Sequence, residues 1–275
     1  MPDPYAFERV AVDDVSLERC ASLLRAVFPS ADYSAELLRW QYRDNPCGAI
    51  VGWNAVAPDG SLAAHYVVQP IESRLGGVVE RGALSFNTAT HPAHQGKGLF
   101  TQLGQRTYAS AAEEGCGHVV GVANANSTPG FTRKLGFALV RPLEARIGLA
   151  LRAREERSAS YERAWDAAGA RWRALRPGAR YRSIGDTLYA CASQPLVRAV
   201  LASGPAFAAV ADSRLGFRPI DLWIGLEPSG APPGFEIPMR FRPSPLNLIF
   251  LDLTQKGRAL DPSTVRFRAV DFDAY

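Results

Sequence analysis

HQGKGLF, at residues 94–100, is the stretch that decides the fold of this 275-residue sequence. Gly96 and Gly98 stand one residue apart, between an apolar β-type run and a helix-type run that begins at Leu99. Because glycine has no β-carbon, a phosphate group can approach the main chain closely and accept its N–H groups. The N-terminus of the following helix adds the positive end of its dipole, and Lys97 adds a nearby charge. The stretch therefore predicts a turn that binds a diphosphate.

Two other phosphate-binding loops do not fit the surrounding sequence. A dinucleotide fold needs parallel strands and a third glycine, but the apolar runs at 49–56 and 62–68 flank turn residues and are typical of a hairpin. A Walker loop needs Gly-Lys followed by Ser or Thr, and here Lys97 is followed by Gly98. The order of elements around the loop must therefore identify the fold.

Apolar spacing, caps and turn residues predict the elements of the first half of the chain. Helices are expected at 17–28, 34–42, 99–111 and 127–135, and strands at 49–56, 62–68, 78–90, 118–123 and from 136. This order predicts a mixed α/β domain with a mixed sheet over residues 1–150.

The second half predicts a smaller α/β unit over residues 151–275. A polar linker at 152–164 leads into a helix around Trp165 and Trp172. Beyond it we expect a helix at 195–201 and strands at 187–192, 207–211 and 246–253. Both halves place a Trp-bearing helix shortly before a strand, which suggests a duplication.

Composition indicates an ordinary soluble protein. Hydrophobic residues make up 47% and charged residues 21%, the net charge is +4, and the arginines are scattered as on a solvated surface. No apolar run reaches the roughly 18 residues that a membrane span needs, and no signal peptide is evident. We therefore expect a cytoplasmic location, no nucleic acid as partner and no membrane span. Four widely separated cysteines predict neither a metal site nor a disulfide framework.

THPAHQGKGLF at 90–100, with LGF at 135–137, resembles the GNAT superfamily of N-acetyltransferases over roughly residues 5–150. The resemblance implies acetyl-CoA or a related acyl-CoA as co-substrate, bound at the end of the fourth strand and the loop after it. Ala93 stands where the family motif expects a polar residue, which main-chain binding does not require. The implied coenzyme-binding residues are Thr88, Ala89, Thr90, His94, Gln95, Gly96, Lys97, Gly98, Leu99, Phe100 and Asn126.

Three shorter segments resemble a bacterial GNAT subgroup associated with surface polysaccharide and amino-sugar acylation. They are LRWQYRDNP at 38–46, NANSTPGF at 124–131 and VDFDAY at 270–275. This resemblance implies direct acyl transfer to an amino sugar, free or nucleotide-linked, by a chain that could form a homodimer. Two alternatives stay open: a different small amine or peptide as acceptor, and a module that binds acyl-CoA or another protein without catalysis.

The catalytic residues have weaker signals. His65 is a candidate general base, although a lone histidine on an apolar strand is more often a core residue. Asp271 and Asp273 share one face of an expected strand, so one could bind an amine and raise the pKa of the other, and a solvated strand is the alternative. Trp40, Tyr42 and Arg43 are candidates for the acceptor pocket, again with aromatic packing as the alternative.

Other polar residues near the expected cleft have lesser roles. Glu80 and Asn87 are weaker candidates for the base, and His118 is expected to be structural. The resembling family often protonates the leaving thiolate with a tyrosine, at a position that Thr132 occupies here. A threonine is a poor acid at neutral pH, so we expect another route for that proton.

Overall fold

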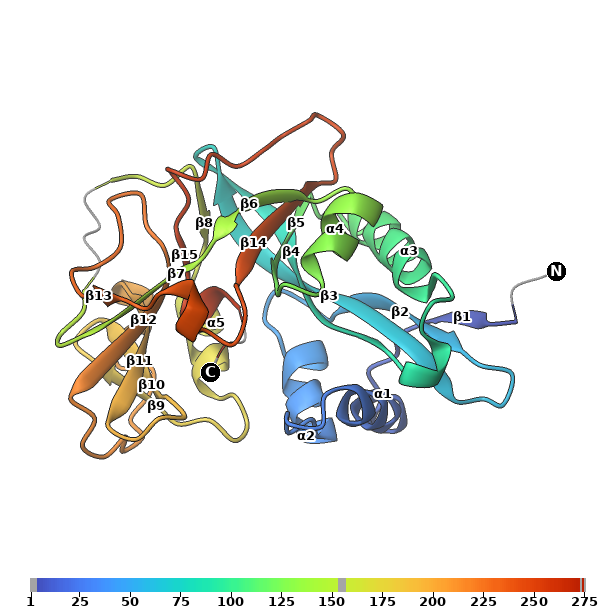
Figure 1. Ribbon diagram of the computed structural model, residues 1–275, viewed down its shortest axis with the longest axis horizontal. Coiled ribbons are helices and arrows are strands. Elements are labelled where there is room, and N and C mark those ends of the chain that lie inside the picture. Colours follow the sequence, from blue (N-terminus) through green and yellow to red (C-terminus); the bar gives the residue numbers. More distant parts are fainter. Residues whose placement is uncertain (1–3, 153–156, 273, 275) are drawn as a thin grey trace.

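The first of two sheets contains the loop at 94–100 and has eight strands. The computed structural model describes residues 4–152, 157–272 and 274, and the two sheets lie side by side (Figure 1). The first sheet has the order β1-β2-β3-β4-β5-β14-β6, and β8 pairs with β3. These strands are β1 (Ala6–Arg9), β2 (Val51–Val56), β3 (Leu62–Leu75), β4 (Val78–Thr90), β5 (His118–Ala123), β6 (Ala138–Pro142), β8 (Tyr161–Arg163) and β14 (Asn247–Asp252).

Helices cover both faces of this sheet (Figure 1). One face carries α1 (Asp14–Val27), α2 (Ala35–Leu38) and a π-helical turn, η1 (Arg39–Arg43), and the other carries α3 (Leu99–Glu113) and α4 (Thr128–Lys134). Alternate side chains of β3 point to opposite faces, so Val67 packs under α1 while its neighbour Tyr66 packs under α3. The fold class predicted from sequence is confirmed for this part of the chain.

The second sheet has the order β13-β7-β12-β11-β10-β9, with β15 paired to β12. The helix α5 (Ala167–Ala174) belongs to this half, and Asp166 caps it by accepting from the Gly169 amide at 2.7 Å. The strands are β7 (Glu144–Gly148), β9 (Tyr181–Ile184), β10 (Thr187–Cys191), β11 (Val197–Ser203), β12 (Ile220–Leu226), β13 (Phe235–Glu236) and β15 (Phe267–Arg268). Single 3-10 turns are η2 (Pro92–His94), η3 (Pro205–Phe207), η4 (Met239–Phe241) and η5 (Ala269–Asp271).

Three expectations for the second half were wrong. The expected helix at 195–201 is strand β11, because Val197, Ala199 and Leu201 alternate inward as a strand requires. The expected strand at 207–211 is preceded by the turn η3 and forms no strand. The strand expected at 246–253 exists as β14, but it lies in the first sheet.

The two sheets follow the same plan. In the first, β2, β3 and β4 form an antiparallel meander and β4 runs parallel to β5. In the second, β9, β10 and β11 form the meander and β11 runs parallel to β12. The next place is filled by an antiparallel strand from elsewhere in the chain, β14 beside β5 and β7 beside β12. The two sheets thus exchange a strand. β7 follows β6 of the first sheet in the chain but pairs in the second sheet, and β14 follows β13 of the second sheet but pairs in the first.

Two tryptophans join the halves through reciprocal contacts. The Trp40 indole N–H donates to the Trp172 carbonyl at 2.8 Å, and the Trp172 indole N–H donates to the Trp40 carbonyl at 3.1 Å. Their rings stack with centroids 4.6 Å apart. Trp40 lies in η1 and Trp172 in α5, the helical segments that precede the two meanders.

Candidate functional site

Strands β4 and β5 diverge at the centre of the first sheet. Their parallel pairing is limited to Ala83–Ser85 opposite Val119–Gly121. Just beyond it, two residues of β4, Asn87 and Thr88, lie opposite Tyr66 alone, which makes a bulge. The loop at 94–100 follows the end of β4, so the gap between the strands leads from this loop into the sheet.

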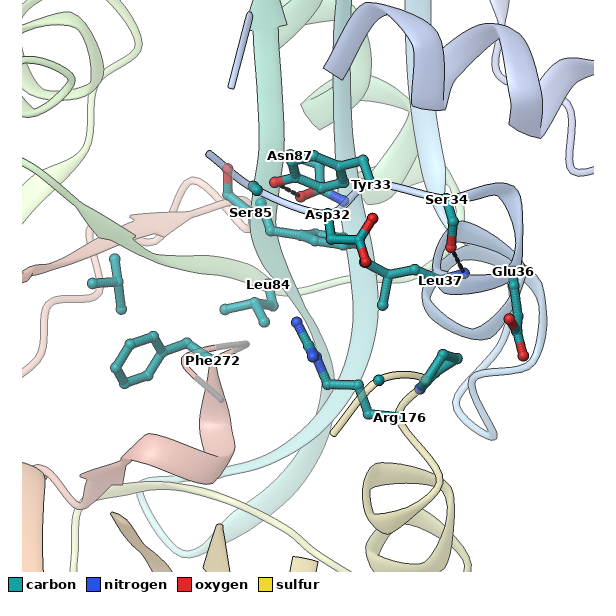
Figure 2. Close-up of a pocket in the computed structure, with 15 residues that line it drawn as sticks. Asp32, Tyr33, Ser34, Glu36, Leu37, Leu84, Ser85, Asn87, Arg176 and Phe272 are labelled. Carbon is teal, nitrogen blue, oxygen red and sulfur yellow. Dashed lines mark hydrogen bonds between the residues drawn. The ribbon is translucent and has the colours of Figure 1, made fainter. Parts of the chain in front are cut away.

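A cavity of about 610 Å³ opens at this gap (Figure 2). Its walls come from the α1–α2 connection, from β4, from the segment after α5 and from Phe272 near the C-terminus, so both halves of the chain contribute. Asp32 and Arg176 carry charged groups that point into it, and Glu36 lies at its rim (Figure 2). The lining residues are Ala31, Asp32, Tyr33, Ser34, Glu36, Leu37, Leu84, Ser85, Phe86, Asn87, Val122, Arg176, Pro177, Gly178 and Phe272.

Asn87, in β4, is held by hydrogen bonds from three surrounding side chains. Its φ is +47°, a left-handed conformation that asparagine tolerates better than most residues. The Tyr33 hydroxyl donates to its Oδ1 at 3.1 Å, and its Nδ2 donates to Gln41 Oε1 at 2.9 Å and to the Tyr42 hydroxyl at 3.2 Å. These bonds fix the bulge that turns β4 away from β5.

His65 is fully buried behind Asn87. Its Nε2 lies 2.8 Å from the Tyr42 hydroxyl and its Nδ1 lies 2.7 Å from Asn54 Oδ1, so Tyr42 donates to the ring and the ring donates to Asn54. Burial lowers the pKa of His65 to about 3. His65 does not line the cavity, and Tyr42 and Asn87 separate it from an acceptor there. This geometry fits a positioning residue better than a general base.

The loop at 94–100 presents its main chain to solvent. Gly96 has φ +75° and Gly98 has φ +74°, and both conformations favour glycine. A β-carbon at Gly96 would meet nothing within 4 Å, and one at Gly98 would meet only Gln102 Nε2 at 3.9 Å. Within the described part of the chain, the amide groups of residues 96–100 donate to no protein acceptor. The loop can therefore offer these donors to an anion at the N-terminus of α3.

Neighbouring residues hold this loop in place. The Tyr5 hydroxyl lies 2.9 Å from His94 Nδ1, and the Lys97 ammonium lies over the Tyr5 ring at 5.8 Å from its centroid. Gln95 Nε2 is 3.5 Å from the Thr90 carbonyl. Leu99, the first residue of α3, is buried in the core and anchors the helix start.

The remaining coenzyme candidates lie along the gap or at its far side. Thr88 has a buried hydroxyl with no hydrogen-bond partner among the described residues, and Ala89 packs beneath α1. Asn126 is exposed before α4, where its amide donates to Asn124 Oδ1 at 3.0 Å. Thr132 donates to the Thr128 carbonyl at 3.0 Å, so its hydroxyl is committed to the helix backbone.

The structure places Asp271 away from the cavity. Its Oδ1 accepts from the Trp165 indole at 2.7 Å and its Oδ2 accepts from the Arg268 amide at 2.6 Å. Burial raises the pKa of this carboxyl group. It belongs to the turn η5 and not to the strand that was expected, so that expectation was wrong. Asp273 lies outside the described residues.

None of the three predicted acceptor residues lines the cavity. Trp40 stacks on Trp172, Tyr42 is fully buried beside His65, and Arg43 is exposed and pairs with Asp44 Oδ1 at 3.1 Å. Tyr42 contributes to the site through its bond to Asn87. Sequence reasoning missed Asp32, Glu36 and Arg176, because only the fold brings these segments together. The position of Asp32 between two expected helices was the one available signal.

The other weaker candidates are structural in their contacts. His118 is fully buried, with Nδ1 2.7 Å from Glu80 Oε1, and Glu80 also pairs with Arg258 Nη1 at 2.8 Å. Among the residues described, no group of three His, Cys, Asp or Glu side chains is arranged to hold a metal ion. No helix in those same ranges is long and apolar enough to cross a bilayer.

Comparison with known proteins identifies the first half of the chain. Residues 11–140 match the family model described as the acetyltransferase (GNAT) domain. No curated protein sequence matches the chain. The match is confined to these residues, and residues 141–275 lie outside the family model.

Solved structures share the fold across both halves. A "probable N-acyltransferase" from Enterococcus faecalis is 11% identical, with a TM-score of 0.58 over 91% of this chain and 73% of that one. A GCN5-related N-acetyltransferase from Kribbella flavida is 12% identical, with a TM-score of 0.55 over 90% of this chain and 71% of that one. One from Anabaena variabilis is 10% identical, with a TM-score of 0.54 and coverage of 90% and 73%.

Proposed function

We propose that this GNAT acetyltransferase domain moves an acyl group, in the simplest case acetyl, directly from acyl-CoA to the amine of a small acceptor. One observation carries the proposal. The gap between β4 and β5 joins a loop with free main-chain donors to a cavity that holds carboxylates. A coenzyme lying in this gap would bring its thioester to the inner end of the cavity.

The coenzyme side depends on the main chain more than on side chains. The amides of residues 96–100 and the dipole of α3 would hold the diphosphate, with Lys97 as an exposed cation nearby. The Thr88 hydroxyl, on the bulge of β4, is the proposed contact for the pantetheine arm. Asn126, beyond the end of β5, is the proposed contact on the opposite side.

The acceptor side favours a cationic group. Asp32 and Glu36 line the cavity and can hold an ammonium group before it loses its proton, while Leu37 and Phe272 offer apolar surface. A volume of about 610 Å³ accommodates a sugar with a linked group. We propose an amino sugar, free or nucleotide-linked, as the acceptor. A different small amine or a peptide N-terminus is the alternative.

The proposed reaction forms one bond and breaks one. The neutral amine nitrogen attacks the thioester carbonyl, the carbon–sulfur bond breaks, and the departing thiolate takes up the proton that the amine releases. Main-chain amides where β4 bends at Asn87 would polarise the carbonyl. Because Thr132 is bonded to the helix backbone, solvent in the cavity is the proposed carrier of the proton.

We further propose that residues 151–275 form a degenerate copy of the domain at 1–150, with β7 and β14 exchanged between them. The shared meander, the parallel strand after it and the paired tryptophans support this. The second copy has η3 where the first has η2, but no glycine loop or long helix follows. Beyond Val200 and Trp223, β11 and β12 diverge, and β15 and η5 contact them there.

Thiol release from acetyl-CoA tests the function. We expect release of free CoA with glucosamine or a nucleotide-linked amino sugar, above the rate of hydrolysis without acceptor. Mass spectrometry of the acceptor should show N-acetylation. Transfer only to a peptide or another small amine would replace the acceptor class. Coenzyme binding without transfer to any amine in the panel would favour the non-catalytic alternative.

A further inference from the structure

A second cavity, in the second half of the chain, is lined by four arginines. Its volume is about 290 Å³, and it lies between β8, the end of β11, the turn η3 and the segment 266–271. We call it the arginine cavity. Its charged lining residues are Arg74, Glu162, Arg163, Arg266, Arg268 and Asp271.

Three of these arginines are paired with carboxylates. Arg266 Nη1 lies 2.6 Å from Glu162 Oε2, and its Nε lies 2.9 Å from Glu227 Oε2. Arg268 Nε lies 2.6 Å from Glu227 Oε1, and Arg74 Nε lies 3.5 Å from Glu162 Oε1. These pairs fix the walls of the cavity.

Arg163 makes no ion pair among the described residues, although the nearby Asp271 carboxylate attracts it. Its Nη1 donates to the main-chain carbonyl of Asp271 at 3.3 Å, and its guanidinium lies over the Trp165 ring at 4.0 Å. Burial lowers the pKa of Arg163. One of the five N–H donors of the guanidinium thus has a protein acceptor. The Trp165 indole covers one face of the guanidinium but accepts no hydrogen bond from the N–H groups at its edge.

The Arg163 guanidinium is partly exposed and lines the cavity, so the oxygens of a bound ligand can accept from the N–H groups that no described residue uses. The planar edge of Arg163 suits two oxygens of one phosphate or carboxylate group, and the Trp165 ring holds the plane in orientation. The other three arginines keep the potential around it positive even though each is paired. Among the lining residues, four arginines stand beside two carboxylates, Glu162 and Asp271, so positive charge is in excess.

The place of the cavity in the fold points the same way. In the second sheet β11 is followed by the 3-10 turn Pro205–Phe207, just as β4 is followed by Pro92–His94 at the start of the glycine loop. Residues 202–207 line the arginine cavity. The arginine cavity therefore occupies a place in the second sheet that corresponds to the glycine loop of the first. The first sheet offers main-chain N–H donors at this place, and the second offers arginine side chains.

We propose that the arginine cavity binds a small molecule through a phosphate or carboxylate group, with Arg163 as the main donor. This proposal does not depend on acyl transfer. The site is distinct from the 610 Å³ cavity, with which it shares no lining residue.

Titration with inorganic phosphate and, separately, with malonate tests the proposal at constant ionic strength. Calorimetry gives the affinity. A change in tryptophan emission that is absent in Trp165→Phe reports occupancy, because the ligand would contact the guanidinium that covers the Trp165 ring. We expect saturable binding of one of the two anions. Loss of the charge-assisted bonds in Arg163→Gln should weaken it about tenfold or more. Arg163→Lys, which keeps the charge but loses the planar fork, should weaken it less.

Two control variants separate this site from other sources of binding. Arg171→Gln removes an exposed arginine of α5 and should leave the affinity unchanged. Gly98→Asp should block the coenzyme loop, so binding that survives in Gly98→Asp and falls in both Arg163 variants supports the proposal. Equal affinity in the wild type and both Arg163 variants, binding that is lost only in Gly98→Asp, or no saturable binding of either anion would overturn it.

Discussion

Replacing Gly98 with alanine separates the backbone requirement of the loop from its proposed role in coenzyme binding. Gly98 has φ +74° and its β-carbon would have open space, with Gln102 Nε2 at 3.9 Å as the nearest atom. The substitution therefore adds conformational strain and no clash. A left-handed alanine costs roughly 1–2 kcal/mol, which we expect as the loss in the free energy of unfolding.

The expected loss of coenzyme affinity is larger than this strain. The new methyl group would stand where the diphosphate approaches the amides of residues 96–100. Hydrogen bonds to a charged group contribute about 1.5–3 kcal/mol each, so loss of one bond raises the Kd of acetyl-CoA by roughly 10- to 150-fold. Gly98→Asp adds a negative charge to the same methyl group and should raise the Kd further.

Calorimetry with acetyl-CoA and urea unfolding measure the two quantities on the same samples. Gly216→Ala is the matched control, because Gly216 has φ +71°, is exposed, and would also meet nothing within 4 Å. Both alanine variants should lose similar stability, and only Gly98→Ala should lose coenzyme affinity. If Gly98→Ala and Gly98→Asp bind acetyl-CoA as tightly as Gly216→Ala does, the loop does not hold the diphosphate.

Three further changes test the core, the junction between the halves and the cavity. Burial lowers the pKa of His65 from 6.5 to about 3, so below pH 6.5 the unfolded chain binds a proton that the folded chain does not. The free energy of unfolding is therefore highest above pH 6.5 and falls by about 1.4 kcal/mol per pH unit below it, and His65→Gln should flatten this fall in urea unfolding between pH 7 and 5. Trp40→Phe leaves the Trp172 carbonyl without its donor and should lower the unfolding free energy by about 1–3 kcal/mol, with Trp172→Phe non-additive in the double variant. Asp32→Asn should raise the KM for the amine with kcat nearly unchanged. The increase should be only a few-fold, because Asp32 is exposed and an exposed ion pair contributes little binding energy. An unchanged KM would remove Asp32 from the acceptor site.

Local signals in the sequence were sufficient for the first half of the fold. Capping residues, turn residues and the change from two-residue to helical spacing place the elements from α1 to β6 in order, and the glycine loop lies between β4 and α3 as expected. Its coenzyme contacts stay a prediction.

The rest depended on contacts that no local pattern encodes. The residues around His65 are apolar on both sides of the strand, so the sequence does not tell which face its side chain occupies. Its burial follows from its contacts with Tyr42 and Asn54 in the structure. Residues 195–201 contain enough leucine, valine and alanine to suit a helix, and their pairing with β10 and β12 decides for a strand. Arg176 reaches the cavity because the two tryptophans hold the halves together.

The exchange of β7 and β14 has a consequence for synthesis on the ribosome. When β5 and β6 have left the exit tunnel, the place between them is still empty, since β14 is made only after the strands from β7 to β13. The nascent first half must wait with unpaired strand edges, which are templates for misassembly between neighbouring chains. A fragment that ends near residue 150 would keep this open seam permanently. We expect it to aggregate unless a peptide with the sequence of β14 is supplied.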